Sequence, residues 1–112
     1  KVVYPGFKEH PGYEIMKKQA RGFGAMLTFE LTKKEYAFEI LENVKMIKYA
    51  ESLGGVETLI TYPATQTHAD VPEEIRIKNG ITDCVLRMSV GIENVKDLLN
   101  ELEEVFAKVR GE

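Results

Sequence analysis

Arg87 is the residue of this sequence whose surroundings best suit chemistry. It stands in CVLRMSVGIE, residues 84–93, where apolar residues recur at every second position, the side-chain period of a β-strand. One face of this predicted strand carries Leu86, Met88, Val90 and Ile92. The other face carries Arg87 with the small residues Ser89 and Gly91 beside it, which leaves room for another group to approach. Arg87 is therefore either a solvent-facing strand residue, as is common on the open face of a sheet, or the anchor of an anion site.

The other residue types that could do chemistry are too few and too scattered to form a recognisable site. The chain has two histidines, His10 and His68, and a single cysteine, Cys84. Because no pair among them has the spacing of zinc ligands, we expect no metal site. A thiol–imidazole pair of His68 and Cys84 is less favoured than a small apolar role for Cys84 at the start of a strand. The GFG and SLGG segments lack the length and the Lys-Ser/Thr ending of a phosphate-binding loop.

Composition narrows the class of protein. A chain of 112 residues fits one domain, and a net charge of −3 without a basic block argues against a nucleic-acid partner. No apolar run approaches the roughly 20 residues of a membrane span, so we expect no membrane partner. Cys84 alone cannot form an internal disulfide, which fits the cytoplasm, where we expect the protein. The chain enters a β-type run directly at Lys1, without an initiator Met, and we expect it to be cut from a longer protein.

The elements that must position Arg87 are predicted from periodicity and from turn residues. Predicted strands cover residues 1–4, 25–31, 45–49, 58–62 and 84–93, and predicted helices cover residues 11–19, 33–43, 72–79 and 95–109. Several strands follow one another through short loops. This order predicts an α+β fold, an α/β sandwich with an open, mostly antiparallel sheet and helices packed on one face.

Helix ends and one loop carry further signals. Thr32 and Glu35 have the spacing of a capping box, and Asn94 is a good N-cap for the last helix. The paired glycines of AESLGGV, residues 50–56, can take positive φ and let another group come close to the backbone. The last helix has the most continuous apolar stripe, which consists of Val95, Leu98, Leu99, Leu102, Val105, Phe106 and Val109.

Four segments together resemble a known family, in its order and spacing. They are YPG and HPGYEI within residues 4–15, FGAMLTFEL (23–31), AESLGGVETLITYPATQTHA (50–69) and LRMSVGIENVKDLL (86–99). They are similar to the C-terminal domain of the pyridoxal-phosphate enzymes of Cys/Met metabolism, which include cystathionine γ-synthase, cystathionine γ-lyase, cystathionine β-lyase and methionine γ-lyase. The resemblance covers essentially the whole chain and implies the C-terminal small domain of a fold-type I enzyme.

The resemblance implies roles for five residues. Arg87 matches the arginine that binds the substrate α-carboxylate, and Ser52 matches the serine that helps to hold it, with Leu53 beside it. Thr67 lines the same pocket. Glu51 stands where γ-synthases and γ-lyases have a glutamate, which can meet the distal amino group of cystathionine or assist chemistry at the γ-carbon. The alternative for Glu51 is a plain loop acid.

The resemblance also implies what lies outside the chain. Residues 1–112 are expected to be the C-terminal substrate-binding domain, whereas the Schiff-base lysine and the other groups that hold pyridoxal 5'-phosphate belong to the N-terminal domain. None of the lysines here stands in a matching context, so the chain alone is expected to be inactive and to hold no catalytic or cofactor-binding residue. The expected parent is a homotetrameric cystathionine γ-synthase or γ-lyase, which acts on cystathionine or a homoserine ester. A β-lyase, a methionine γ-lyase and a stand-alone amino-acid-binding or oligomerisation module are the alternatives.

Overall fold

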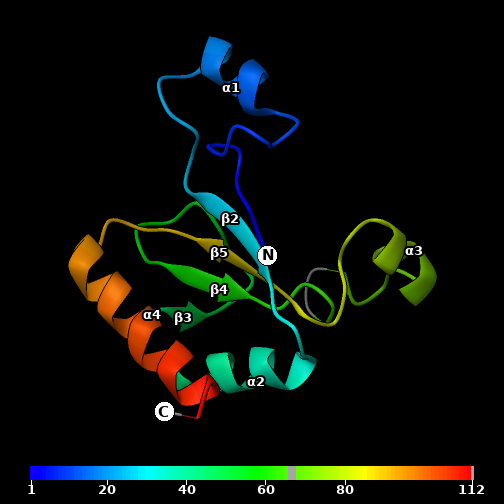
Figure 1. Ribbon diagram of the computed structural model, residues 1–112, viewed down its shortest axis with the longest axis vertical. Helices are drawn as coiled ribbons and strands as arrows, with labels where there is room; N and C mark the ends of the chain where they lie inside the picture. The colour runs from blue at the N-terminus through cyan, green and yellow to red at the C-terminus, as the bar shows by residue number, and fades with distance from the viewer. Residues whose placement is uncertain (66–67, 112) are drawn as a thin grey trace.

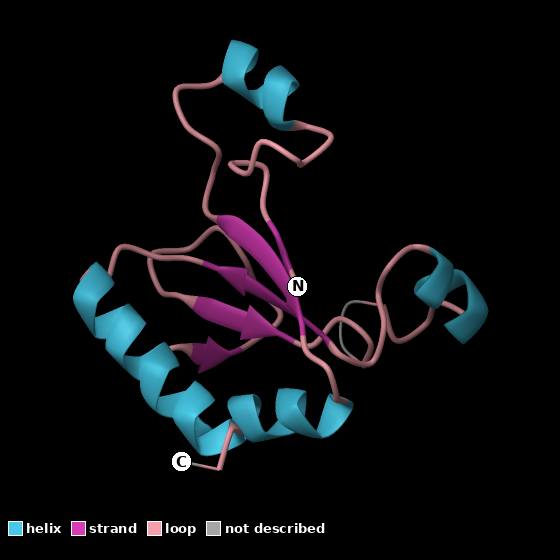
Figure 2. Ribbon diagram, viewed as in Figure 1, coloured by secondary structure: helices cyan, strands magenta, loops and turns pink. Residues whose placement is uncertain are grey.

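A computed structural model describes residues 1–65 and 68–111, and the strands of this part of the chain form one sheet (Figures 1 and 2). The strands are β1 (Val2–Val3), β2 (Met26–Glu30), β3 (Lys48–Tyr49), β4 (Leu59–Thr61) and β5 (Val85–Ser89). Their order in the sheet is β1-β2-β5-β4-β3. Every neighbouring pair is antiparallel except β3 and β4, which are parallel. The expected open and mostly antiparallel sheet is confirmed.

Two helices form the layer that covers one face of the sheet. The helices are α1 (Tyr13–Gln19), α2 (Lys34–Asn43), α3 (Glu73–Lys78) and α4 (Val95–Val109). Buried side chains of α2 and α4 share one cluster with residues of β2, β4 and β5. In Figure 1, α1 lies above the sheet and α3 to its right, so neither belongs to this layer. Among the described residues, no helix has both the length and the apolar character that crossing a membrane requires.

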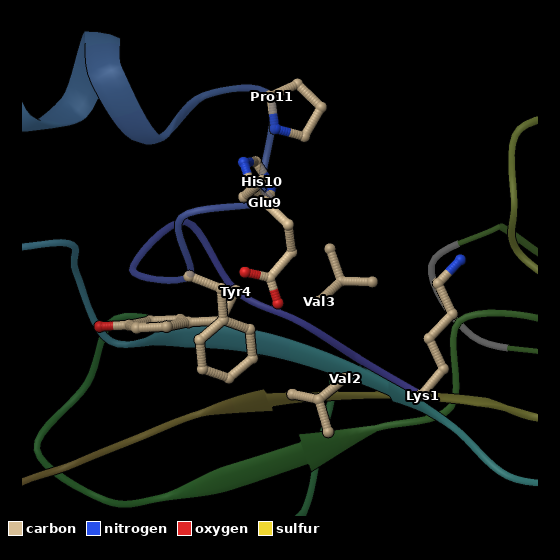
Figure 3. A pocket seen from close by; sticks show the side chains of 8 residues that line it. Lys1, Val2, Val3, Tyr4, Glu9, His10 and Pro11 are labelled. Atoms are coloured by element: carbon tan, nitrogen blue, oxygen red, sulfur yellow. The ribbon is translucent and has the colours of Figure 1, made fainter.

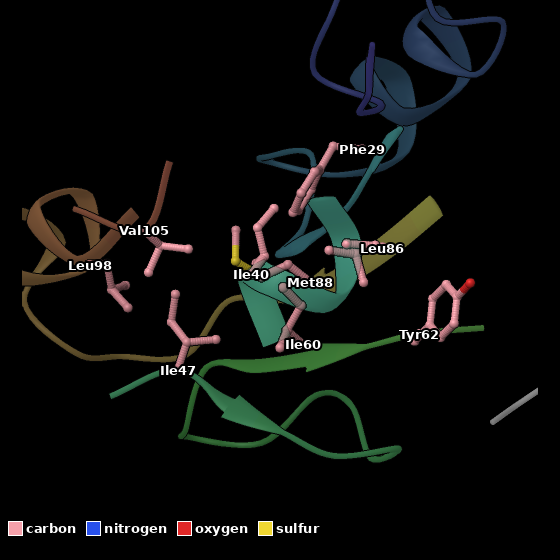
Figure 4. Packing of buried hydrophobic residues seen from close by; sticks show 10 residues of the cluster. Phe29, Ile40, Ile47, Ile60, Tyr62, Leu86, Met88, Leu98 and Val105 are labelled. Carbon is pink, nitrogen blue, oxygen red and sulfur yellow. The ribbon is translucent and has the colours of Figure 1, made fainter. Parts of the chain in front are cut away.

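The core lies between the sheet and this helical layer (Figure 4). Leu86 and Met88 of β5 are buried there, as the alternation predicts, and Ile60 of the neighbouring strand β4 lies beside them. Phe29 of β2 meets Phe106 of α4 edge to face, with ring centroids 6.2 Å apart. The central strand β5 is therefore held by apolar contacts on one side, and its other side carries Arg87 and Ser89 together with buried Val85.

Three apolar residues that were predicted to face the core are instead exposed. Ile92 is 82% exposed, because β5 ends at Ser89 and the backbone N–H of Ile92 donates to Val56 O in a loop. Val95 and Leu99 of α4 are 64% and 57% exposed. The apolar stripe of α4 is therefore buried only at its remaining positions.

The two capping signals had different outcomes. Asn94 caps α4 as predicted, since its side-chain oxygen accepts from the N–H of Lys96 at 2.8 Å. The capping box of Thr32 and Glu35 is wrong, because the N-cap of α2 is Lys33 and no side chain caps it. With the helix starting one residue later, Glu35 occupies the second helical position instead of the third that the box requires.

The predicted strand over residues 45–49 is shorter than expected because Glu101 of α4 binds its first part. The Glu101 carboxylate accepts from the backbone N–H groups of Lys45 at 3.0 Å, Met46 at 2.7 Å and Ile47 at 2.8 Å. These donors are therefore not available to a neighbouring strand, and only Lys48–Tyr49 pairs with β4. One side chain thus fixes the start of β3 on α4.

Glu101→Ala is expected to lower the free energy of unfolding by about 2 kcal/mol, since three backbone donors lose a charged acceptor. The matched control is Glu104→Ala, because Glu104 is exposed on the same helix and the two changes have the same effect on helix propensity. Urea denaturation of both variants measures the difference. Equal losses of stability would mean that the three hydrogen bonds contribute nothing.

Candidate functional site

Arg87 and the predicted site residues 51–53 lie where the connection between β3 and β4 crosses the face of β5 opposite the helices. Because β3 and β4 are parallel, the chain must return along the sheet between them. Two hydrogen bonds show where it passes. Ser89 Oγ accepts from the N–H of Gly54 at 2.8 Å, and Arg87 Nη2 donates to the carbonyl oxygen of Glu51 at 3.3 Å. The topology therefore brings the connecting segment, residues 50–57, next to Arg87.

Arg87 occupies the middle of the central strand and has little to bind within the chain. Its partners across the sheet are Thr28 of β2 and Thr61 of β4, whose side chains share its face. The side chain is partly buried. Within the part of the chain that the structure describes, its only hydrogen bond is the one to Glu51, and it forms no ion pair. A guanidinium has five N–H donors, so most of them are left for an anion.

Arg76 shows how this chain satisfies an arginine that serves the fold. Its guanidinium is buried, pairs with the Asp83 carboxylate at 3.0 Å and donates to Ile81 O at 2.8 Å. These bonds close the turn after α3, where Gly80 has a φ of +84°. This pair was missed in the sequence, although opposite charges on the two sides of a glycine turn were a usable signal. Arg87 has no such partner among the described residues.

The other predicted site residues line an open surface. Glu51, Ser52 and Leu53 are all exposed, and Leu53 keeps 54% of its surface in contact with solvent. Ser52 lies at the rim of a shallow hollow of about 340 Å³ that it shares with Glu57 and with Ala50, Gly55, Val56 and Leu59. Among the described residues, Ser52 and Arg87 are not joined by a hydrogen bond. Thr67 lies outside the described residues.

Residues that the sequence analysis did not single out tie the connecting segment to β5. The carboxylate of Glu93 accepts from the N–H of Thr58 at 2.7 Å and from its hydroxyl at 2.6 Å. These bonds, that from the hydroxyl first, lower the pKa of Glu93. A lowered folded-state pKa means that the carboxylate stabilises the fold at neutral pH, and that this contribution is lost as the pH falls through that pKa.

Gly91 allows the connecting segment to approach β5 closely. A β-carbon at this position would collide with the carbonyl oxygen of Val56, and would lie 2.6 Å from the carbonyl carbon of Glu57 and 2.7 Å from Glu93 Oε1. The sequence alone predicted only that there is room beside Gly91. The structure shows that backbone from the β3–β4 connection fills that room.

The cavity in Figure 3 belongs to another part of the molecule. Its volume is about 290 Å³, and it lies beside β1, lined by Lys1, Val2, Val3, Tyr4, Phe7, Glu9, His10 and Pro11. The ring nitrogen Nδ1 of His10 accepts from the N–H of Gly12 at 2.9 Å, so this imidazole supports a turn. Neither Arg87 nor the 51–53 segment borders this cavity.

Among the described residues, Cys84 does not have the features of a reactive thiol, and the acidic and histidine side chains do not gather into a metal site. Burial, followed by the charges of Glu30 and Asp83, raises the pKa of the Cys84 thiol, which keeps it protonated and poorly nucleophilic at neutral pH. Across residues 1–65 and 68–111, no three His, Cys, Asp or Glu side chains gather where they could share a metal ion.

Comparison with known proteins identifies the family. The family described as Cys/Met metabolism PLP-dependent enzyme matches residues 1–107. The chain belongs to this family. The resemblance found in the sequence is thereby confirmed, as is membership of an enzyme family that depends on pyridoxal phosphate.

Members of the Cys/Met metabolism family with different activities are similar to this chain. A cystathionine β-lyase of Lactococcus lactis subsp. cremoris strain MG1363 is 49% identical over 96% of this chain and 28% of its own length. The structure of a cystathionine γ-lyase from Lactobacillus plantarum complexed with L-serine has a TM-score of 0.92 and 44% identity, over 98% of this chain and 29% of its own. That of a cystathionine γ-synthase from Xanthomonas oryzae pv. oryzae in complex with cystathionine has a TM-score of 0.93 and 41% identity, over 99% of this chain and 29% of its own.

These comparisons establish the fold and the family, but not which reaction of the family is catalysed. The fold is that of the small domain of fold-type I enzymes, and the chain spans 28% of the length of the β-lyase that it matches. Because a β-lyase, a γ-lyase and a γ-synthase are similar to it to comparable degrees, overall identity does not assign one activity.

Gly91→Ala is expected to lower the free energy of unfolding by about 1–3 kcal/mol, because the added methyl group overpacks against backbone. Gly55→Ala is the matched control, since a β-carbon there has no heavy atom within 4 Å. Thermal unfolding of the two variants measures the contrast. If both variants had the same melting temperature, the close approach of backbone at Gly91 would not contribute to stability.

Proposed function

We propose that residues 1–112 are the C-terminal substrate-binding domain of a pyridoxal-phosphate enzyme of transsulfuration, and that Arg87 binds the α-carboxylate of the substrate. One observation carries this proposal. Arg87 is partly buried on the open face of the central strand, faces two threonines, and has no carboxylate partner among the described residues. A charge removed from water in this way is stabilised when an anion pairs with it.

The chemistry of a guanidinium suits a carboxylate. Its parallel N–H groups form two hydrogen bonds to the two oxygens, which fixes the orientation of the amino acid as well as its position. Ser52, on the segment beside Arg87, supplies a hydroxyl that donates to the same carboxylate, and Leu53 forms an apolar border. Thr67 is proposed to line the same pocket. Together these residues hold one end of the substrate and leave the rest of it free to react.

Pyridoxal phosphate supplies an electron sink for a carbanion at the substrate α-carbon when it is bound. The residues of this chain fit the substrate side of such a centre, because the guanidinium of Arg87 lies beside the exposed 51–53 segment on the face of the sheet opposite the helical layer. We propose that the lysine and the other groups that hold the cofactor lie outside residues 1–112. In this division, the chain binds and orients the amino acid and contains no catalytic residue.

Glu51 is proposed to select among substrates, since its carboxylate belongs to the exposed segment next to the arginine. An anionic group there suits the distal ammonium of cystathionine. The favoured parent is therefore a cystathionine γ-synthase or γ-lyase that acts on cystathionine or a homoserine ester. A β-lyase or a methionine γ-lyase is the alternative. We further propose that the parent is a cytoplasmic homotetramer.

Arg87→Ala, made in the full-length enzyme that contains this chain, is expected to raise the KM for cystathionine about tenfold to a hundredfold, the equivalent of the roughly 1.5–3 kcal/mol of a charged hydrogen bond. It should also lower kcat, because the amino acid is no longer oriented. The melting temperature should change little, since the side chain does not belong to the core. Steady-state kinetics and thermal unfolding test this. A variant that unfolds without a specific kinetic effect would make Arg87 a structural residue.

The reaction products of the full-length enzyme separate the members of the family. With the full-length enzyme we expect 2-oxobutanoate, the product of γ-cleavage, or cystathionine made from a homoserine ester. Glu51→Gln should reduce either activity, because it removes the charge that meets the distal ammonium. Glu57→Gln, an exposed acid farther along the same segment, is the control. Pyruvate as the main product would instead assign the enzyme as a β-lyase.

A further inference from the structure

We infer that Glu93 and Thr58 are positioning residues for the carboxylate site, which hold the segment carrying Ser52 against the strand that carries Arg87. This inference rests on the proposed function, because it assigns the two residues a role in binding that function's substrate. Neither residue is proposed to touch the substrate. Their action would be carried by the backbone between Thr58 and Ser52.

Thr58 joins three parts of the chain through one residue. Its hydroxyl donates to Glu93 Oε1 at 2.6 Å and accepts from the N–H of Gly91 at 2.8 Å. Its backbone N–H donates to Glu93 Oε2 at 2.7 Å, and its carbonyl oxygen accepts from the N–H of Lys48 at 3.0 Å. Thr58 is also fully buried. A hydroxyl used both as donor and as acceptor cannot be replaced by an apolar group without removing the acceptor of Gly91 N–H and the side-chain donor of Glu93 Oε1.

Further bonds tie the connecting segment to β5 and to the turn after it. The N–H of Gly54 donates to Ser89 Oγ at 2.8 Å, and the carbonyl oxygen of Val56 accepts from the N–H of Ile92 at 2.9 Å. Ser89 lies on the same face of β5 as Arg87, two positions along the strand. The part of the segment from Gly54 onward is therefore fixed relative to β5, the strand that carries Arg87.

The other end of the segment is fixed to β4. The N–H of Ala50 donates to Ile60 O at 3.0 Å, and the carbonyl oxygen of Ala50 accepts from the hydroxyl of Thr61 at 2.6 Å. Residues 51–53 thus span two anchored points, and within the described chain their one hydrogen bond is that from Arg87 to the carbonyl oxygen of Glu51, at 3.3 Å. Because residues 51–53 are exposed, their position relative to Arg87 depends on the anchors.

A role confined to the fold would predict something different. If Glu93 and Thr58 only stabilised the domain, their loss would lower the melting temperature. The affinity of the folded enzyme would then be unchanged for every ligand. If they position Ser52 beside Arg87, their loss weakens the binding of a ligand that has the carboxylate and leaves the binding of a ligand without it nearly unchanged. The two roles are therefore separated by a pair of ligands that differ only in the carboxylate.

The test uses the full-length enzyme loaded with pyridoxal phosphate and two competitive inhibitors, L-norleucine and L-norleucinamide. The variants are Glu93→Gln, which replaces one accepting oxygen by a donor, and Thr58→Val, which removes the hydroxyl at nearly constant volume. Thr58→Ser restores the hydroxyl and should restore binding. Glu57→Gln removes a neighbouring exposed charge and is the matched control. Arg87→Ala reports on the carboxylate site itself.

In Glu93→Gln and Thr58→Val, the inhibition constant of L-norleucine should rise by about tenfold, within the roughly hundredfold that a misplacement of about 1 Å can cost. That of L-norleucinamide should stay within about twofold, and the KM for cystathionine should rise by a larger factor than kcat falls. Thr58→Ser and Glu57→Gln should behave as the parent enzyme does.

Three results would overturn the inference. The first is an equal change for both inhibitors, or no change, in variants that fold. The second is failure of both Glu93→Gln and Thr58→Val to fold, which would make the pair a structural support. The third concerns the proposed function: if the parent enzyme and Arg87→Ala both bind the two inhibitors equally well, no carboxylate site exists at Arg87. The first result differs from the third, because the parent enzyme then prefers L-norleucine and the variants keep this preference, so that the positioning role alone is refuted.

Discussion

The parallel pairing of β3 and β4 is the constraint on which the candidate site depends. Two antiparallel neighbours could be joined by a tight turn at the edge of the sheet, but parallel neighbours require the chain to return. Here the return passes over β5 and not around the edge, as the bonds from Gly54 to Ser89 and from Arg87 to Glu51 show. The polar face of the central strand is thereby bordered by exposed backbone and small side chains, which is what a ligand needs for close approach.

Arg76 is buried and Arg87 is partly buried, and the two arginines differ in how their charges are compensated. Arg76 is compensated internally by Asp83 and by a carbonyl oxygen, so its desolvation is offset within the fold. Arg87 lacks a carboxylate among the described residues and keeps most of its donors. The fold tolerates Arg87 because the core on the other side of β5, with Leu86 and Met88, stabilises the strand independently of this charge. An anionic ligand would complete an arrangement that the chain leaves open.

The sequence predicts this arrangement wherever a short-range pattern controls it. Alternation within β5 correctly separates Arg87 from Leu86 and Met88, because a two-residue period is a property of the strand alone. The pattern fails at Ile92, where the strand has already ended and Val56 of a distant segment binds the backbone. It fails again at residues 45–47, whose donors bind the carboxylate of Glu101 far along the chain. Contacts of this kind have no local signature.

Family resemblance reaches further than periodicity, since it relates Ser52 and its neighbours to Arg87 although the two segments lie far apart in the chain. It does not indicate what holds them together, because Thr58 and Glu93 are not ligand contacts in the resemblance. The exposed residues of the 51–53 segment and the buried residues that hold the segment differ in how well they tolerate substitution. Glu51 and Leu53 are exposed and their replacement disturbs little packing, whereas buried Thr58 has partners on two other segments, the turn after β5 and β3. Under the proposed function, residues 51–53 can therefore change without breaking the contacts that hold their segment on β5, whereas a change at Thr58 breaks them.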